Sequence, residues 1–191
     1  MVSAPDDILD PQTAAFYRRM LSALEDARIP FLIGGAYALA HYTGIERHTK
    51  DLDVFIHRRD YEGTMQTLAS VGCKTELTFA HWLGKARCGE DFIDVIFSSG
   101  NGIAEVDDEW FEHAREGSAL DTLVRVNPPE EMIWSKAFIM ERERFDGADI
   151  NHLLRACAAE IDWERLLRRF GPHWRAIWRS EERRVGKECR S

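Results

Sequence analysis

The chain has 191 residues, of which 45% are hydrophobic and 30% charged, a composition typical of a globular protein with a sizeable core. Its 33 acidic and 25 basic residues give a formal net charge of −8, which disfavours non-specific binding to nucleic acid. No apolar run approaches the roughly 20 residues of a membrane span. The N-terminal MVSAPDDILDPQ lacks the basic and apolar regions of a secretory signal, so we expect a cytoplasmic protein.

The last thirteen residues, 179–191 (RSEERRVGKECRS), read as a translated sequencing adapter, and we expect them to be a non-native tail. This tail carries five basic and three acidic residues, so residues 1–178 alone carry a formal net charge of −10. We expect 1–178 to form a single domain, with a core at about 30–126 and C-terminal helices at about 128–178. Its cysteines, Cys73, Cys88 and Cys157, form no C-x-x-C pair, which argues against a disulfide framework or a zinc site.

Hydrophobic periodicity places the predicted elements along the chain. Helices are predicted at 11–27, 36–42, 60–70, from 107, at 129–144 and at 161–170, the last with Trp163, Leu166 and Leu167 on one apolar face. Strands are predicted at 31–33, 51–56, 74–78, 84–88, 92–97 and 123–126. This order indicates an α/β fold, with a small mixed sheet of about five strands backed by helices and a helical C-terminal part.

The strand at 51–56 carries two acids on one face. Side chains alternate along a strand, so Asp51 and Asp53 point to one side while Leu52, Val54 and Ile56 point to the other. Two neighbouring carboxylates repel each other unless a cation lies between them, and their oxygens suit hard ions such as Mg²⁺. The strand at 92–97 adds Asp94, a lone acid among apolar residues, whose burial is costly unless it is paired or binds a metal.

A glycine pair precedes these acids. Gly34 and Gly35 follow the strand at 31–33 and open the helix at 36–42. Glycine permits close backbone approach to a ligand, and a helix start presents amide groups to an anion. Pairing of the strands would bring Asp94 beside Asp51 and Asp53 on one face of the sheet.

The ordered set of glycine pair, Asp-x-Asp strand and third acid resembles the nucleotidyltransferase superfamily that includes DNA polymerase beta and the aminoglycoside nucleotidyltransferases. The resemblance covers about residues 30–155. It implies that Gly34 and Gly35 admit a triphosphate, and that Asp51, Asp53 and Asp94 hold two magnesium ions. Fifteen residues separate Gly35 from Asp51, a longer connection than is usual in the superfamily.

Basic residues near these motifs are candidate substrate contacts. Arg47, His48 and Lys50 precede the acids; they would touch phosphates or the base, or form a solvated loop that offsets the acidic charge. Lys136 is the only charge between Met132 and Met140; it would either lie at a surface edge or reach a triphosphate.

A second resemblance covers the segment KAFIMERERFDGADINHLLRA. Nucleotidyltransferases of bacterial abortive-infection and toxin–antitoxin systems have a similar helix pair, in which a Lys and an Arg precede an Asp pair. Lys136, Arg144, Asp146 and Asp149 match in type and order, although Asp146 would also suit a helix cap.

Together these features predict a magnesium-dependent nucleotidyltransferase that moves a nucleoside monophosphate from a triphosphate such as ATP to an acceptor hydroxyl and releases pyrophosphate. The acceptor would be an antibiotic, a protein side chain or an RNA end; the acidic charge makes long nucleic acid a poor candidate. The alternative is a non-catalytic nucleotide-binding or partner-binding module on the same fold, such as a toxin–antitoxin component.

Overall fold

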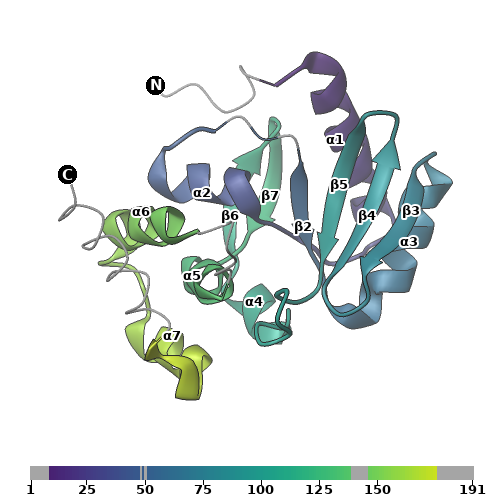
Figure 1. The fold of residues 1–191 in the computed structure, drawn as a ribbon. Coiled ribbons are helices and arrows are strands. Elements are labelled where there is room, and N and C mark those ends of the chain that lie inside the picture. Colours follow the sequence, from purple (N-terminus) through teal and green to yellow (C-terminus); the bar gives the residue numbers. More distant parts are fainter. Residues whose placement is uncertain (1–8, 48, 50, 139–145, 176–191) are drawn as a thin grey trace, which may run out of the picture. The chain divides into compact units, whose positions relative to one another are not determined.

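The structure is a computed structural model that describes residues 9–47, 49, 51–138 and 146–175. It divides into two compact units, residues 1–128 (unit 1) and residues 129–191 (unit 2), which are described separately below (Figure 1). The expectation of a single domain over 1–178 stays a prediction. The proposed non-native tail at 179–191 lies outside the described residues.

Unit 1 is built on one mixed sheet of seven strands in the order β3-β4-β5-β2-β1-β7-β6 (Figure 1). The strands are β1 (Leu32–Ile33), β2 (Leu52–Phe55), β3 (Lys74–Phe79), β4 (Leu83–Cys88), β5 (Asp91–Ile96), β6 (Arg115–Ala119) and β7 (Thr122–Val126). β2 pairs with β5, and β1 with β7, in parallel; the other neighbours are antiparallel. The predicted α/β fold with a mixed sheet is confirmed.

The prediction of about five strands is wrong, and β6 is the strand that no pattern indicated. Its sequence, REGSA, is charged and contains a glycine, because it lies at the edge of the sheet and pairs only with β7. The turn that joins these strands uses Leu120 and Asp121 at φ values of 56° and 58°. Hairpin turns with this backbone conformation usually contain Asn-Gly or Asp-Gly. Leu120-Asp121 is not such a pair, so the sequence did not indicate the hairpin.

The helices of unit 1 are α1 (Pro11–Asp26), α2 (Gly35–Thr43), α3 (Tyr61–Ser70) and α4 (Asp108–Glu112), with a short 3₁₀ turn, η2 (Arg58–Asp60). α1 is capped by Asp10, whose side chain accepts from the amides of Gln12 and Thr13. Its apolar stripe, which includes Tyr17, Met20 and Leu24, is completely buried.

α3 identifies the two faces of the sheet. A Cβ on Gly84 of β4 would meet the Tyr61 and Met65 side chains of α3, so α3 packs tightly on the face to which Gly84 points. α1 contacts both α3 and β5. Lys85, the next residue in β4, points to the opposite face. That face, which also carries Asp94, is called the acid face below.

Unit 2 contains α5 (Pro129–Ala137), α6 (Gly147–Cys157), α7 (Trp163–Phe170) and a 3₁₀ turn, η3 (Gly171–His173). Both α6 and α7 pack on α5. The predicted helix over 129–144 is described only as far as Ala137, and its remainder, including Arg144, falls outside the described residues apart from Phe138.

The predicted apolar face of α7 is wrong in part. Leu166 is buried, but Trp163 and Leu167 are 46% and 51% exposed. The Arg165 guanidinium instead points inward, where its Nη2 lies 2.6 Å from Glu130 and its Nη1 lies 2.5 Å from Glu131. A buried charge must be paired. These ion pairs, and not the apolar residues, therefore determine which side of α7 faces inward.

Within the described part of the chain, no helix combines the length and the apolar character that crossing a membrane requires. Cys73, Cys88 and Cys157 are free thiols, and two of them, Cys73 and Cys157, are buried.

Candidate functional site

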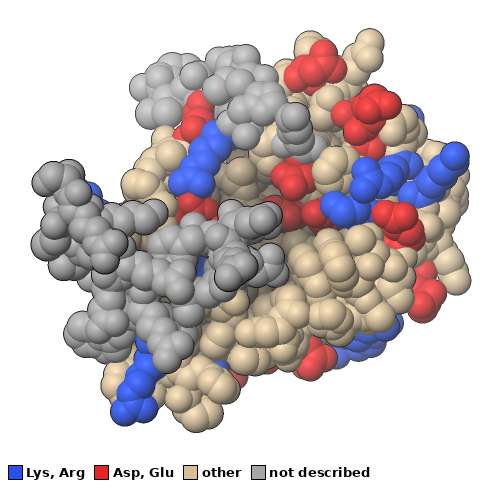
Figure 2. Space-filling model, viewed as in Figure 1, with Lys and Arg blue, Asp and Glu red and all other residues tan. Residues whose placement is uncertain are grey.

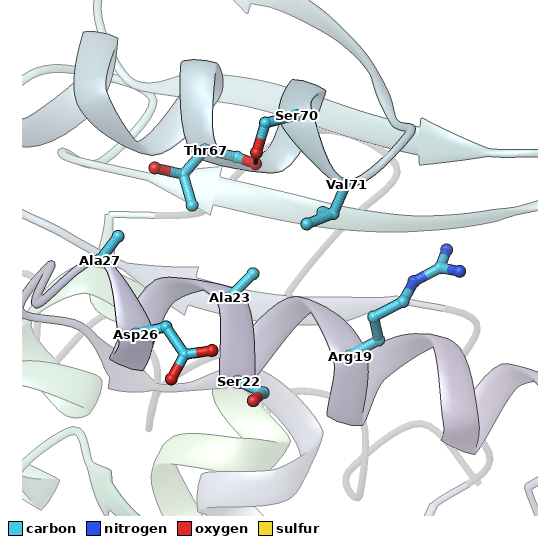
Figure 3. Close-up of a pocket in the computed structure, with 8 residues that line it drawn as sticks. All are labelled: Arg19, Ser22, Ala23, Asp26, Ala27, Thr67, Ser70 and Val71. Atoms are coloured by element: carbon cyan, nitrogen blue, oxygen red, sulfur yellow. Dashed lines mark hydrogen bonds between the residues drawn. The ribbon is translucent and has the colours of Figure 1, made fainter.

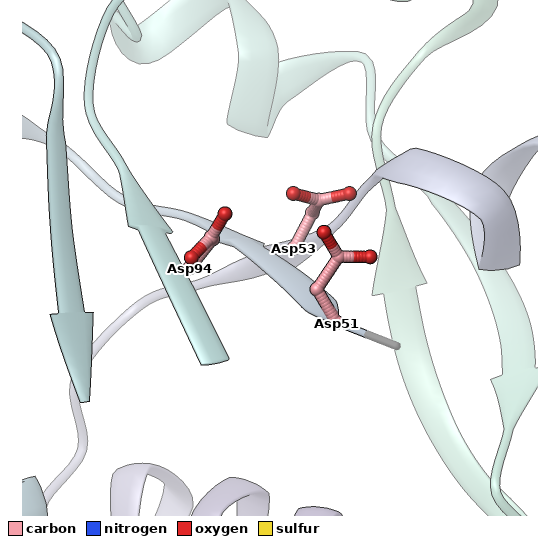
Figure 4. Close-up of side chains that lie close together, drawn as sticks. All are labelled: Asp51, Asp53 and Asp94. Carbon is pink, nitrogen blue, oxygen red and sulfur yellow. The ribbon is translucent and has the colours of Figure 1, made fainter. Parts of the chain in front are cut away.

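Three carboxylates converge on the acid face of unit 1 (Figure 4). Asp51 lies immediately before β2, Asp53 lies within it, and Asp94 lies in β5. The parallel register pairs Asp53 directly with Asp94, and the two-residue period places Asp51 on the same side. One carboxylate oxygen from each residue lies within 4.8 Å of the others. The predicted juxtaposition of these acids is therefore present in the structure.

The glycine pair lies against this cluster. The Gly34 amide donates to the Asp53 carbonyl at 3.0 Å. Gly35 has φ +54°, and a Cβ there would come within 1.8 Å of the Asp53 carboxylate oxygen Oδ2. A Cβ on Gly34 would come within 2.2 Å of the Phe55 ring. Only glycine therefore fits at either position, and α2 begins beside the acids with no side-chain cap on its N-terminus.

Asp94 is the most buried of the three acids, with 9% of its surface exposed. Burial raises the pKa of its carboxyl group, while the ammonium of Lys85 opposes that rise and the charge of Asp51 adds to it. The Lys85 Nζ lies 2.5 Å from Asp94 Oδ1. Asp51 accepts a hydrogen bond of 2.6 Å from the Thr49 hydroxyl.

Lys85 is a site residue that the sequence reasoning missed. It lies directly opposite Asp94 in the antiparallel β4–β5 pair. The signal is the short Gly89–Glu90 connection between the predicted strands at 84–88 and 92–97, because counting outward from Cys88 and Asp91 pairs position 85 with position 94.

The donor set fits a divalent ion such as Mg²⁺. Three carboxylates gathered at this distance repel one another, and oxygen ligands of this kind are those that hard cations prefer. Gly35 contributes by leaving room for the Asp53 carboxylate.

Of the three basic residues predicted to contact the substrate in the segment before Asp51, the structure describes only one. Arg47 is exposed in the loop that follows α2, whereas Lys50 and His48 lie outside the described residues. In the loop at 98–102, Asn101 Oδ1 accepts hydrogen bonds from the Ser99 hydroxyl and from the Ile103 amide.

Lys136 belongs to unit 2 and forms ion pairs with two acids of that unit. Its ammonium is 2.8 Å from Asp146 and 2.9 Å from Asp149. Burial lowers the pKa of this ammonium, but the two carboxylates outweigh that effect and raise the pKa above its usual value. The interpretation of Lys136 as a side chain at a surface edge is wrong, because only 12% of the side chain is exposed. Asp146 stands at the N-cap position of α6 but makes no capping bond with its side chain.

A groove between α1 and α3 is separate from this acid cluster (Figure 3). It is lined by Arg19, Ser22, Ala23, Asp26, Ala27, Thr67, Ser70 and Val71. None of the predicted site residues borders it, and it holds no group of residues suited to catalysis.

The family described as uncharacterised nucleotidyltransferase matches residues 12–172, most of the chain and all of the acid cluster. The chain belongs to this nucleotidyltransferase family. No curated protein matches its sequence.

Solved structures share the fold. The solution structure of the antibiotic-resistance factor ANT(2'')-Ia is 18% identical with a TM-score of 0.62, over 94% of this chain and 98% of that one. ANT(2'')-Ia in complex with adenylyl-2''-tobramycin is 19% identical with a TM-score of 0.61, over 90% and 99%. The lincosamide antibiotic adenylyltransferase LnuA, lincomycin-bound, is 16% identical with a TM-score of 0.52, over 76% and 96%. At these identities the likeness establishes the nucleotidyltransferase fold alone.

Proposed function

We propose that this protein transfers a nucleoside monophosphate from a nucleoside triphosphate such as ATP to a hydroxyl group of a small acceptor. The observation that carries the proposal is the convergence of Asp51, Asp53 and Asp94 beside the Gly34–Gly35 pair, in a chain that belongs to a nucleotidyltransferase family. In the reaction, the acceptor oxygen forms a bond to the α-phosphorus, the bond to pyrophosphate breaks, and the acceptor proton leaves to a base.

The three acids have distinct roles in this proposal. Asp51 and Asp53 hold divalent ions, for which we propose Mg²⁺, and Asp94 completes the ligand set. Bound ions of this kind supply charge stabilisation to the transferring phosphoryl group and its leaving oxygen. Asp94 also accepts the acceptor proton, and its contact with Lys85 fixes the orientation of the carboxylate before the substrates arrive.

The glycine pair and the start of α2 bind the leaving phosphates. The two glycines let Phe55 and Asp53 pack against the start of α2, and the first amides of α2, which have no side-chain cap, are available to an anion. Arg47 and Lys50 lie between α2 and β2 in the sequence, and we propose them as further phosphate contacts. For Lys136, contact with the triphosphate competes with a purely structural role in its pairing with Asp146 and Asp149.

A small acceptor is supported by the fold neighbours, whose bound molecules are adenylyl-2''-tobramycin and lincomycin. The net charge of −8 disfavours long, polyanionic nucleic acid as the acceptor. We propose the cytoplasm as the location, since nucleoside triphosphates are the donor.

Replacement of Asp53 with Asn tests the proposal. An amide oxygen carries no formal charge and binds Mg²⁺ poorly. We expect turnover, measured as pyrophosphate release with Mg²⁺ and each triphosphate, to fall at least a hundredfold, about 3 kcal/mol in transition-state stabilisation. Asp121→Asn is the matched control, because Asp121 has a side chain that is 77% exposed and loses the same charge.

Stability separates loss of catalysis from loss of fold in this experiment. Two charges at the 4.8 Å that bounds the cluster repel by about 1 to 3 kcal/mol, depending on the effective dielectric constant. Asp53→Asn should therefore melt at the parental temperature or higher without metal. Near-parental turnover in the variant would remove Asp53 from the mechanism. Stabilisation of the parent by nucleotide without any turnover would favour the non-catalytic binding module.

A further inference from the structure

The acid face continues beyond the three acids onto β4 and β3. Strand register places Asp53, Asp94, Lys85 and Glu76 in one row across β2, β5, β4 and β3. Because register partners point to the same side of a sheet, these side chains share one face. Figure 2 shows Lys and Arg side chains gathered over β4 and β3, beside the central acids.

A second row carries an aromatic ring followed by two cations. Phe92 of β5 pairs with Arg87 of β4, which pairs with Lys74 of β3. The Lys85 Nζ lies 4.4 Å and the Arg87 Cζ 4.8 Å from the centroid of the Phe92 ring. Phe92 is partly exposed, and the Arg87 side chain is 46% exposed, with its Nε 3.6 Å from Glu76. This aromatic–cationic patch, formed by Lys74, Lys85, Arg87 and Phe92, therefore adjoins Asp94 directly.

The geometry of the proposed reaction indicates which substrate meets this patch. In an in-line displacement the attacking and leaving oxygens lie on opposite sides of the phosphorus. The Gly34–Gly35 pair, proposed above for the leaving phosphates, follows β1 on one side of β2. β5 and β4 lie on the other side of β2, so the acceptor approaches from the patch.

We propose that the acceptor is a small hydroxyl compound with an anionic group, a carboxylate or a phosphate, attached to a flat apolar part. The flat part packs on Phe92, and the anion lies beside Arg87 and Lys74. Among the described residues on this face of β3, β4 and β5, Glu76 is the one acid outside the metal-binding set. A polycationic acceptor would be repelled by the like charges of the patch, so the patch disfavours binding of such acceptors. This inference rests on the proposed function and specifies its substrate class.

Three probes with one skeleton isolate the charge: para-(hydroxymethyl)benzoate, para-(hydroxymethyl)benzamide and para-(hydroxymethyl)benzylamine. Their binding to the full chain is measured by ligand-observed NMR with Mg²⁺ and ATP present, and their nucleotidylation by mass spectrometry. We expect the benzoate to bind at least about tenfold more tightly than the benzylamine, with the benzamide between them, as expected for a charge-assisted contact at a half-exposed arginine. A phosphate analogue, para-(hydroxymethyl)phenyl phosphate, distinguishes the two anion types.

Two variants complete the experiment. Arg87→Gln should reduce the preference for benzoate about tenfold and leave the melting shift given by Mg²⁺ and ATP unchanged. Arg28→Gln is the control, because it removes the same charge from an exposed residue. Arg28 precedes the start of β1, whereas the glycine pair follows the end of that strand. This variant should retain the preference for benzoate. Arg87→Lys should retain most of the preference for benzoate.

The outcomes divide the two proposals. Equal binding of all three probes, tighter binding of the benzylamine, no binding of the benzoate, or an undiminished preference in Arg87→Gln would overturn the anionic acceptor. A benzoate preference that depends on Arg87, without pyrophosphate release under any condition, would uphold the anion-binding patch and contradict the transfer reaction.

Discussion

Gly35→Ala tests whether the backbone next to the acids must be bare. The substitution has two costs that the structure separates. Gly35 has φ +54°, a conformation that costs an alanine about 1 to 2 kcal/mol. In addition, the new Cβ would lie 1.8 Å from Asp53 Oδ2, far inside contact distance, so the carboxylate must move. Because Asp53 is a proposed metal ligand, this movement should impair metal and nucleotide binding.

Gly44→Ala is the matched control. Gly44 closes α2 with φ +67°, and a Cβ there would meet nothing within 4 Å. It therefore experiences the backbone strain alone, about 1 to 2 kcal/mol, which corresponds to roughly 2 to 8 °C in melting temperature for a chain of this size. Gly35→Ala should lose about 1 to 3 kcal/mol more than this control, because the clash adds to the same strain.

The deciding measurement is the melting temperature with and without Mg²⁺ and a triphosphate. A ligand at one hundred times its Kd stabilises a protein by about 2.7 kcal/mol. The parent and Gly44→Ala should both show such an upward shift, whereas Gly35→Ala should show little or none. If Gly35→Ala responds to nucleotide as fully as Gly44→Ala, the close packing of Gly35 against Asp53 has no role in binding.

Two further predictions concern residues away from the acids. Lys136→Met removes the ammonium that contacts the buried Asp146 and Asp149 carboxylates, so it should destabilise the protein by about 3 kcal/mol in a thermal melt. Lys74→Met, at an exposed position, should not. An unchanged melting temperature with a lost response to nucleotide would instead favour contact of Lys136 with the triphosphate. Burial raises the pKa of the Cys73 thiol to about 11, so alkylation near pH 8, monitored by mass spectrometry, should modify Cys88 before Cys73. The rate at Cys73 should rise with pH toward that value, and faster modification of Cys73 than of Cys88 would contradict this.

The side of the sheet on which each acid lies was predictable from strand periodicity, whereas the parallel β2–β5 register that sets Asp94 beside Asp53 belongs to the tertiary fold. Once β2 and β5 are recognised, the two-residue period fixes the side of Asp51, Asp53 and Asp94, and burial of the apolar alternates fixes which side faces the helices. The glycine pair was predictable for a related reason, since its position between a strand and a helix leaves few uses for two residues without side chains. Local patterns therefore gave both halves of the candidate site.

Interactions between distant segments could not be predicted in the same way. Arg165 of α7 is buried against Glu130 and Glu131 of α5, about 35 positions earlier. In the sequence these three residues resemble an ordinary solvated helix surface. Their burial depends on how two helices pack, and that packing overrode the apolar pattern by which Trp163 and Leu167 were expected to face inward.

β2 carries both core residues and acids of the candidate site. Its residues alternate between Leu52 and Val54, which are completely buried, and the acid-face side chains of Asp53 and Phe55. The carbonyl of Asp53 accepts the Gly34 amide, while its carboxylate occupies the space that Gly35 leaves free. One residue therefore ties the sheet, the start of α2 and the acid cluster together. Repulsion among the acids opposes this arrangement, and the buried apolar side of β2 favours it, so the strand holds the carboxylates together without a cation. For the proposed transfer reaction, this would be the preorganisation that electrostatic catalysis requires.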